Sequence, residues 1–221
     1  MTKVISDLQY ITQETSSWSH VQLAELACSG GVRWVQLRVK GKTDDVFLQL
    51  AQKVKAVCEK YGSRLIINDN VGIAKAVAAN GVHLGKEDMH PVKARQLLGE
   101  NSIIGGTANT IEDILHLSAY GVDYIGLGPF RFTTTKEKLS PILGLEAYVK
   151  LVGECQKHNI TTPLIAIGGI KIEDVSLLME TGIHGIAVSS AINLAADPGK
   201  RAKEFLTVLH SCRKELTEPG S

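Results

Sequence analysis

Short apolar runs alternate with helix-length segments along the chain, and this alternation limits the fold more than any other feature. The runs lie at residues 8–12, 34–38, 65–68, 81–84, 102–107, 124–127, 163–167 and 185–188. Apolar residues recur every three or four positions in the segments between them, which predicts helices near 21–27, 46–57, 71–79, 91–98, 111–119, 147–155, 175–180 and 198–209. Strands joined by helices pair in parallel, because each helix returns the chain to the same end of the sheet.

Eight strand–helix units in 221 residues favour an α/β fold, a closed TIM (β/α)8 barrel. No hairpin turn signal stands between two alternating runs. The alternative is an open doubly wound sheet, but the GxGxxG loop expected after its first strand is missing. We expect a single catalytic domain over residues 1–221, with a peripheral C-terminal tail after about residue 211.

Composition excludes several classes of partner. The 24 basic and 23 acidic side chains nearly balance, so no long-range field would hold a nucleic acid. The first residues lack the apolar core of a signal peptide, and no apolar run approaches the roughly 20 residues that span a bilayer, so we expect a cytoplasmic protein. Reduced thiols are expected from the scattered Cys28, Cys58, Cys155 and Cys212. The sequence leaves open whether the chain forms a homo-oligomer.

Two aspartates follow neighbouring predicted strands. Asp69 comes directly after the run 65–68, and Asp88 comes four residues after the run 81–84. Parallel strands joined by one helix end side by side, so the two carboxylates should lie close together and a divalent cation is expected between them. The alternative is that each aspartate only caps the next helix, near Val71 or at Pro91.

Polar residues stand at the other strand ends as well, where barrels of this type carry their active sites. Alternation places Gln36 and Arg38 on the face of Trp34, and we expect this face to point into the barrel mouth, since the outer face meets helices. The full rim set is Gln36, Arg38, Lys40, Asn68, Asp69, Asp88, Thr107, Thr133, Thr135, Lys136, Gly168, Gly169, Ser189 and Ser190. Such cations, carboxylates, hydroxyls and backbone amides suit a metal-bound pyrophosphate and a separate phosphate.

Two further features bear on the site. The loop after residue 127 runs to about residue 142, is rich in Thr and Lys, and outruns the usual two to six residues, which favours a binding role. His83 lies inside a predicted strand, where a hydrogen-bonded structural histidine is the favoured interpretation.

Six motifs in this order resemble the thiamine phosphate synthase family. They are QLRVK at 36–40, IINDN at 66–70, GVHLGKED at 81–88, DYIGLGPF at 123–130 with TTTK at 133–136, AIGGI at 166–170 and SSAI at 189–192. The resemblance covers nearly the whole chain and implies a TIM barrel that needs Mg²⁺. Such an enzyme condenses hydroxymethylpyrimidine diphosphate with a carboxylated or decarboxylated thiazole phosphate and releases pyrophosphate.

The resemblance also implies a role for each matching residue. The pyrimidine diphosphate would be held by Gln36, Arg38, Lys40, Asn68, Thr107 and Lys136, of which Arg38, Lys40, Thr107 and Lys136 would act in catalysis. Mg²⁺ would be held by Asp69 and Asp88. The thiazole phosphate would be held by Thr133, Thr135, Gly169, Ser189 and Ser190. Pyrophosphate would leave first, and the thiazole nitrogen would then capture a pyrimidine carbocation.

The chain departs from the family pattern at three places. Val39 stands where an acidic residue is common, Thr107 replaces a common serine, and the segment 130–144 is irregular and longer than usual. Two alternatives stay open. One is the related thiazole tautomerase, which should not need the paired Asp69 and Asp88, and the other is a noncatalytic sensor of phosphorylated ligands.

Overall fold

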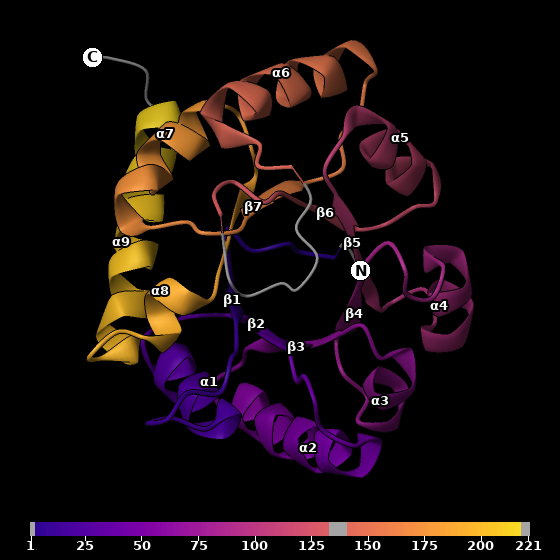
Figure 1. The fold of residues 1–221 in the computed structure, drawn as a ribbon, viewed down its shortest axis with the longest axis vertical. Helices are drawn as coiled ribbons and strands as arrows, with labels where there is room; N and C mark the ends of the chain where they lie inside the picture. The colour runs from indigo at the N-terminus through magenta and orange to yellow at the C-terminus, as the bar shows by residue number, and fades with distance from the viewer. Residues whose placement is uncertain (1–2, 133–140, 218–221) are drawn as a thin grey trace.

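The chain folds into a closed parallel barrel ringed by helices (Figure 1). The computed structural model describes residues 3–132 and 141–217, and within these residues eight strands pair in chain order until β8 pairs with β1. The strands are β1 (Leu8–Ile11), β2 (Trp34–Leu37), β3 (Arg64–Asn68), β4 (Gly81–Leu84), β5 (Ile103–Ala108), β6 (Tyr124–Leu127), β7 (Leu164–Ile167) and β8 (Gly185–Val188). The TIM barrel prediction is confirmed, and the open doubly wound sheet is excluded.

Helices follow the strands as the periodicity predicts. They are α1 (His20–Ser29), α2 (Asp44–Lys60), α3 (Val71–Ala76), α4 (Pro91–Leu98), α5 (Ile111–Ala119), α6 (Gly144–Lys157), the 3-10 helix η1 (Ile172–Asp174), α7 (Val175–Glu180), α8 (Ser190–Asn193) and α9 (Pro198–Thr217). Each predicted strand starts and ends within one residue of the observed strand. The helix predictions missed the short α8 and η1, whose single turns carry no periodic pattern.

Two helix ends differ from the prediction for local reasons. Helix α3 ends earlier than expected, because Ala78 adopts a left-handed backbone with φ of 48°. Helix α9 continues past residue 209 to Thr217, with Cys212 buried and Arg213 paired to Asp7 across 3.0 Å. The peripheral tail after about residue 211 stays a prediction. All four cysteines are free and buried.

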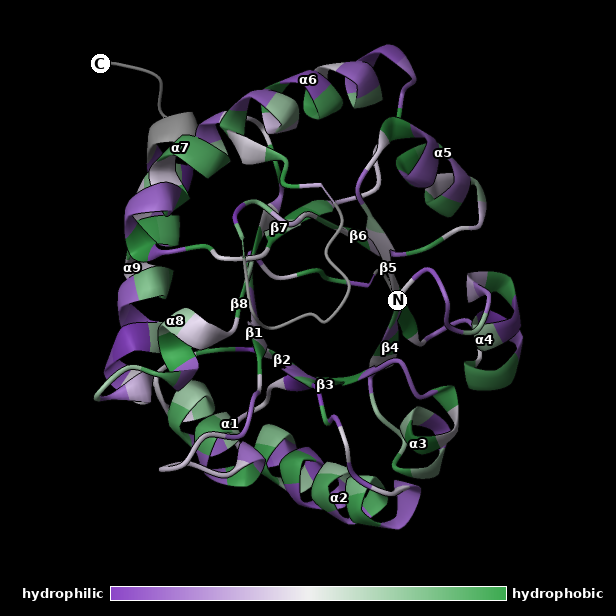
Figure 2. Ribbon diagram, in the orientation of Figure 1, coloured by the Kyte–Doolittle hydropathy of each residue, from purple (hydrophilic) through white to green (hydrophobic). Residues whose placement is uncertain are grey.

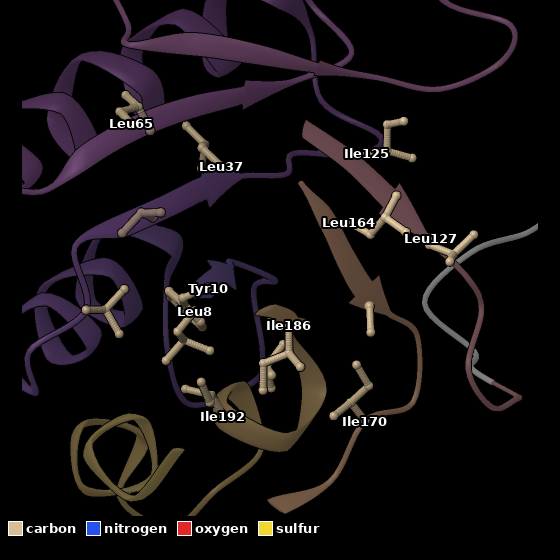
Figure 3. Close-up of a cluster of buried hydrophobic side chains, with 14 of the residues drawn as sticks. Leu8, Tyr10, Leu37, Leu65, Ile125, Leu127, Leu164, Ile170, Ile186 and Ile192 are labelled. Carbon is tan, nitrogen blue, oxygen red and sulfur yellow. The ribbon is translucent and has the colours of Figure 1, made fainter. Parts of the chain in front are cut away.

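The buried side chains form two clusters on opposite faces of the strands. The outer cluster joins strand residues such as Leu8, Leu37 and Ile186 to apolar residues of the helices (Figure 3). The inner cluster fills the barrel with Ile11, Trp34, Ile66, Ile103, Tyr124, Ile165 and Ala187. Hydrophobic and hydrophilic residues both appear along the surrounding helices, as expected for amphipathic helices packed on a barrel (Figure 2).

One glycine decides how the barrel interior is filled. Gly105 lies on β5, and a Cβ atom there would come within 2.1 Å of Cζ of Tyr124 on β6. The missing side chain leaves room for the Tyr124 ring, which packs edge-on against Trp34 with 4.7 Å between ring centroids. In the described residues no helix is long and apolar enough to cross a membrane.

Candidate active site

Asp69 and Asp88 meet at the carboxyl ends of β3 and β4, as the sequence predicts. The backbone N–H of Asp69 donates to the carbonyl oxygen of His83 at 2.8 Å, which continues the β3–β4 pairing past the end of β3. The Asp88 carboxyl is close enough to the Asp69 carboxyl for each to shift the pKa of the other. Lys40 donates from Nζ to Oδ2 of Asp69 at 2.5 Å, so a cationic side chain from the loop after β2 joins the pair.

Neither aspartate caps a helix. Asn70 is the N-cap of α3 and accepts a hydrogen bond from the N–H of Ile73 at 2.9 Å, while His90 is the N-cap of α4. Asp88 instead accepts from the N–H of Gly85 at 2.6 Å, inside its own loop. Asp69 has a left-handed backbone with φ of 65°, a conformation that costs free energy and gathers at functional sites. The capping alternative is therefore wrong for both residues.

The two carboxyl groups differ in their pKa because their surroundings differ. Burial works to raise the pKa of Asp69, but hydrogen bonds from Lys40 and Asp88 and the charge of Lys40 outweigh it, so this pKa lies below its ordinary value. Partial burial raises the pKa of Asp88, and the Asp69 carboxylate adds to the rise against the N–H of Gly85. One carboxylate is thus ready to bind a cation, and the second ionises less easily beside it.

The pair fits a Mg²⁺ ion that keeps other ligands. Mg²⁺ commonly takes one or two protein carboxylates together with water and substrate phosphate oxygens, rather than a cage made only of protein groups. Among residues 3–132 and 141–217, no group of three or more His, Cys, Asp or Glu side chains could hold a metal ion. Two close carboxylates at an open rim supply the protein ligands that Mg²⁺ commonly takes, and they leave its other positions to water and substrate.

A buried hydrogen-bond chain crosses the barrel beneath this rim. Gln36 donates to Gln9 at 3.0 Å, Gln9 donates to the hydroxyl of Tyr124 at 3.0 Å, and that hydroxyl contacts Nδ1 of His83 at 3.0 Å. His83 Nε2 lies 3.0 Å from Oγ1 of Thr107. The predicted site residues Gln36 and Thr107 are thereby joined through side chains that sequence reasoning did not assign to the site.

His83 fits its predicted role, since both ring nitrogens have partners in this chain and its ring stacks on Tyr124. Gln9 was missed, although it lies between the outward-facing Leu8 and Tyr10, and alternation would have turned it inward. Asn68 is buried at the end of β3, while Arg38 is half-buried and Lys40 exposed beyond the end of β2.

Small and hydroxylated residues lie at the ends of β7 and β8. Gly168 and Gly169 have φ of 98° and 68°, in the left-handed region that favours glycine. A Cβ atom on Gly169 would come within 2.8 Å of Cβ of Arg131, so the turn also needs a residue without a side chain at this position. Ser189 precedes α8, and Ser190 is its first residue; both are half-buried at the same rim as the aspartates.

Arg131 ties the loop after β6 to the loop after β7. Its guanidinium makes two hydrogen bonds to the Asp174 carboxylate, with Nη2 at 2.5 Å from Oδ1. Asp174 also accepts from the N–H of Lys171 at 2.8 Å. This ion pair was missed, because residues 131 and 174 are far apart in sequence and neither lies at a strand end. The predicted residues Thr133, Thr135 and Lys136 lie outside the described residues.

Comparison with known proteins decides the family. A family model described as thiamine monophosphate synthase matches residues 8–192. The chain belongs to this family. A thiamine-phosphate synthase of Bacteroides fragilis is 47% identical over 201 residues, which cover 91% of this chain and 98% of the relative. One from Flavobacterium johnsoniae is 51% identical over 185 residues, covering 84% of this chain and 87% of the relative.

The fold of the thiamine monophosphate synthase family agrees with the barrel described above. A solved thiamine phosphate pyrophosphorylase from Pyrococcus furiosus superposes with a TM-score of 0.81 at 29% identity, covering 93% of this chain and 96% of that structure. Membership in the family makes this protein an enzyme of the transferase class in thiamine biosynthesis.

Proposed function

We propose that the enzyme joins hydroxymethylpyrimidine diphosphate to a thiazole phosphate, with or without its carboxylate, and releases pyrophosphate, together with carbon dioxide where the thiazole carries a carboxylate. The observation that carries this proposal is the pair of close carboxyl groups on Asp69 and Asp88, with Lys40 against it. A carboxylate pair beside a cationic side chain suits a diphosphate that arrives with a divalent cation. A tautomerase that uses no diphosphate has no evident need for this arrangement.

The reaction transfers the pyrimidinylmethyl group. The bond between the methylene carbon and the diphosphate oxygen breaks, and its electron pair leaves with pyrophosphate. The thiazole nitrogen then donates its lone pair to the carbocation, which forms the new carbon–nitrogen bond. The main demand on the protein is therefore to stabilise negative charge on the leaving group. When bound, Mg²⁺ would supply positive charge to the same phosphate oxygens.

Residues of this chain would divide that task by position. Asp69 and Asp88 would hold Mg²⁺, and Lys40, whose side chain is 57% exposed beside Asp69, would turn to a phosphate oxygen. Arg38 and Lys136 would add charge to the diphosphate. Gln36, Asn68 and Thr107 would orient the pyrimidine.

Orientation has support in the buried hydrogen-bond chain. The contact between Nε2 of His83 and Oγ1 of Thr107 limits the positions that the Thr107 hydroxyl can take, and the bond to Gln9 limits the Gln36 amide. Side chains held in advance lose less entropy when a substrate binds.

The thiazole phosphate would bind on the opposite part of the rim. We assign it to Gly169, Ser189 and Ser190, together with Thr133 and Thr135. Loops after the last two strands are the frequent phosphate site of TIM barrels. Backbone N–H groups exposed by a left-handed glycine turn and the two serine hydroxyls are suitable donors for phosphate oxygens.

One incubation separates the three functions considered. The purified protein is mixed with both substrates, with Mg²⁺ or with EDTA, and the products are resolved by chromatography. Thiamine phosphate that forms only with Mg²⁺ supports the proposal. Metal-independent isomerisation of the thiazole alone would indicate a tautomerase. Ligand binding without any product would indicate a sensor.

The metal assignment has its own test. Asp69→Asn and Asp88→Asn should each lower kcat by roughly 100-fold or more, because each removes charge that holds the cation against the leaving group. Asp45→Asn is the matched control, since Asp45 is an exposed acid in the first turn of α2 and should leave kcat within about twofold. Near-wild-type rates in both site variants would contradict the assignment.

A further inference from the structure

A second buried hydrogen-bond network lies behind Ser189. Asn193, at the end of α8, is 2% exposed, and its Nδ2 lies 3.1 Å from the carbonyl oxygen of Ile11 and 3.0 Å from Oγ of Ser189. The hydroxyl of Tyr10 bonds to Oδ1 of the same amide. Tyr10 is itself fully buried among the outer-cluster side chains (Figure 3). The network therefore joins β1 to the end of β8 through the buried side chains of Tyr10 and Asn193.

The chemistry of the groups fixes the direction of each hydrogen bond. The carbonyl of Ile11 can only accept, so the nitrogen of the Asn193 amide must face it. The amide oxygen then faces Tyr10, whose hydroxyl must donate. The second hydrogen on Nδ2 is left for Oγ of Ser189, which therefore accepts. Every polar atom of the Asn193 side chain is satisfied in one orientation only.

The direction of these hydrogen bonds determines what the Ser189 hydroxyl can do. Its hydroxyl oxygen already accepts from Asn193, so its own proton is available for donation. In the part of the chain that the structure describes, no acceptor takes that proton. Ser189 is half-buried at the rim, where β8 ends. Because the Ser189 hydroxyl accepts from Asn193 on its buried side, it can donate its proton to an anion on its exposed side.

We propose that Asn193 and Tyr10 are positioning residues that hold the Ser189 hydroxyl as a hydrogen-bond donor to the phosphate of the thiazole substrate. This inference rests on the proposed function, because it takes Ser189 as part of the phosphate site. The family match covers residues 8–192, so Asn193 lies one residue beyond it. Neither Asn193 nor Tyr10 touches substrate in this scheme; both act through Ser189.

The test is a double-mutant cycle on kinetic constants. Asn193→Ala should raise KM for the thiazole phosphate about 5- to 10-fold, with kcat and KM for the pyrimidine diphosphate within about twofold, since it weakens the hydrogen bond from Ser189 to the phosphate without removing it. Ser189→Ala should raise the same KM by at least as much. In the Ser189→Ala background, Asn193→Ala should add nothing, because its target is already gone.

Tyr10→Phe covers the case in which Asn193→Ala fails to fold. It leaves Oδ1 of Asn193 without a donor and should raise KM for the thiazole phosphate about 2- to 4-fold, again only when Ser189 is present. Tyr148→Phe is the matched control, because the buried Tyr148 hydroxyl bonds to the carbonyl of Leu127 and not to this network. The control should leave the thiazole phosphate KM unchanged.

Three results would overturn the inference. The first is an unchanged KM in Ser189→Ala, the second is an unchanged KM in both Asn193→Ala and Tyr10→Phe, and the third is full additivity in the cycle. Calorimetric titration of the thiazole phosphate into wild type, Asn193→Ala and Ser189→Ala, without the pyrimidine substrate, keeps this test separate from the proposed function. Weaker binding in both variants supports the network even if no thiamine phosphate forms, whereas equal binding in all three proteins overturns it.

Discussion

The Arg131–Asp174 ion pair gives a prediction whose size follows from its geometry. Asp174 is 5% exposed and accepts hydrogen bonds from the guanidinium of Arg131 and from the N–H of Lys171. Asp174→Asn keeps the shape of the side chain but removes its charge and one of its acceptor oxygens. The amide that replaces this oxygen is itself a donor and would face a donor of Arg131.

Asp174→Asn should lower the free energy of unfolding by about 1.5–2 kcal/mol. A hydrogen bond to a charged group contributes roughly 1.5–3 kcal/mol, and we take the lower part of that range because the Arg131 side chain is 44% exposed and water can replace the lost partner. For a protein of this size, about 2–4 °C in Tm corresponds to each kcal/mol, so Tm should fall by roughly 3–8 °C.

The effect should depend on pH with a definite sign. Burial works to raise the pKa of Asp174, but the hydrogen bonds from Arg131 and Lys171 outweigh it and lower this pKa in the folded protein. The carboxylate therefore stabilises the fold at pH values above its unfolded pKa of about 3.9, and this stabilisation is lost as the pH falls through the folded value. The difference between wild type and Asp174→Asn should be largest near pH 7 and shrink below about pH 4.

Urea and thermal unfolding at pH 7 measure the loss, and Glu173→Gln is the matched control. Glu173 is the neighbouring acid, with a side chain 64% exposed and 3.8 Å from Lys171, so its variant should stay within about 0.5 kcal/mol of wild type. Arg131→Gln alone and together with Asp174→Asn completes a cycle that should show coupling of about 1 kcal/mol. Equal stability of Asp174→Asn and Glu173→Gln would refute the reasoning.

Two further predictions concern stability. Gly105→Ala should destabilise the fold by about 3 kcal/mol or more, because its Cβ would come within 2.1 Å of the Tyr124 ring. Gly153→Ala in α6 should stabilise the fold by about 0.5–1 kcal/mol, because its Cβ would have nothing within 4 Å. Urea unfolding of both variants checks this. Burial lowers the pKa of His20. As the pH falls, the unfolded chain therefore protonates this ring before the folded protein does. Stability should therefore fall as the pH drops below about 6.5, and His20→Gln should flatten that dependence in melts between pH 5 and 8; an unchanged slope would contradict it.

Much of the candidate site could be predicted because barrel topology converts sequence order into position. Once Asp69 and Asp88 follow consecutive parallel strands, their proximity does not depend on side-chain detail. Strand order could not decide in the same way whether the two aspartates cap the helices that follow them. Asn70 and His90 are nearer to the helix starts than the aspartates are, and only the backbone turns reveal that they take the cap positions.

Contacts between side chains from distant strands were the part that could not be predicted. Gln36 bonds to Gln9, and Asn193 bonds to Tyr10, across separations of 27 and 183 residues. Such pairs depend on the stagger of the closed barrel and on where a glycine such as Gly105 leaves space. Neither is encoded in a local pattern.

The sequence by itself determined the eight strands, the parallel barrel and the set of polar residues at its mouth, because hydrophobic periodicity and strand order are local properties of the chain. Only the tertiary structure decided which of those residues contact one another. It placed Lys40 on Asp69, joined Gln36 to Thr107 through a chain of three other side chains, and set Asn193 behind Ser189. Those partnerships depend on distances of a few ångströms across the barrel, which are fixed when it closes.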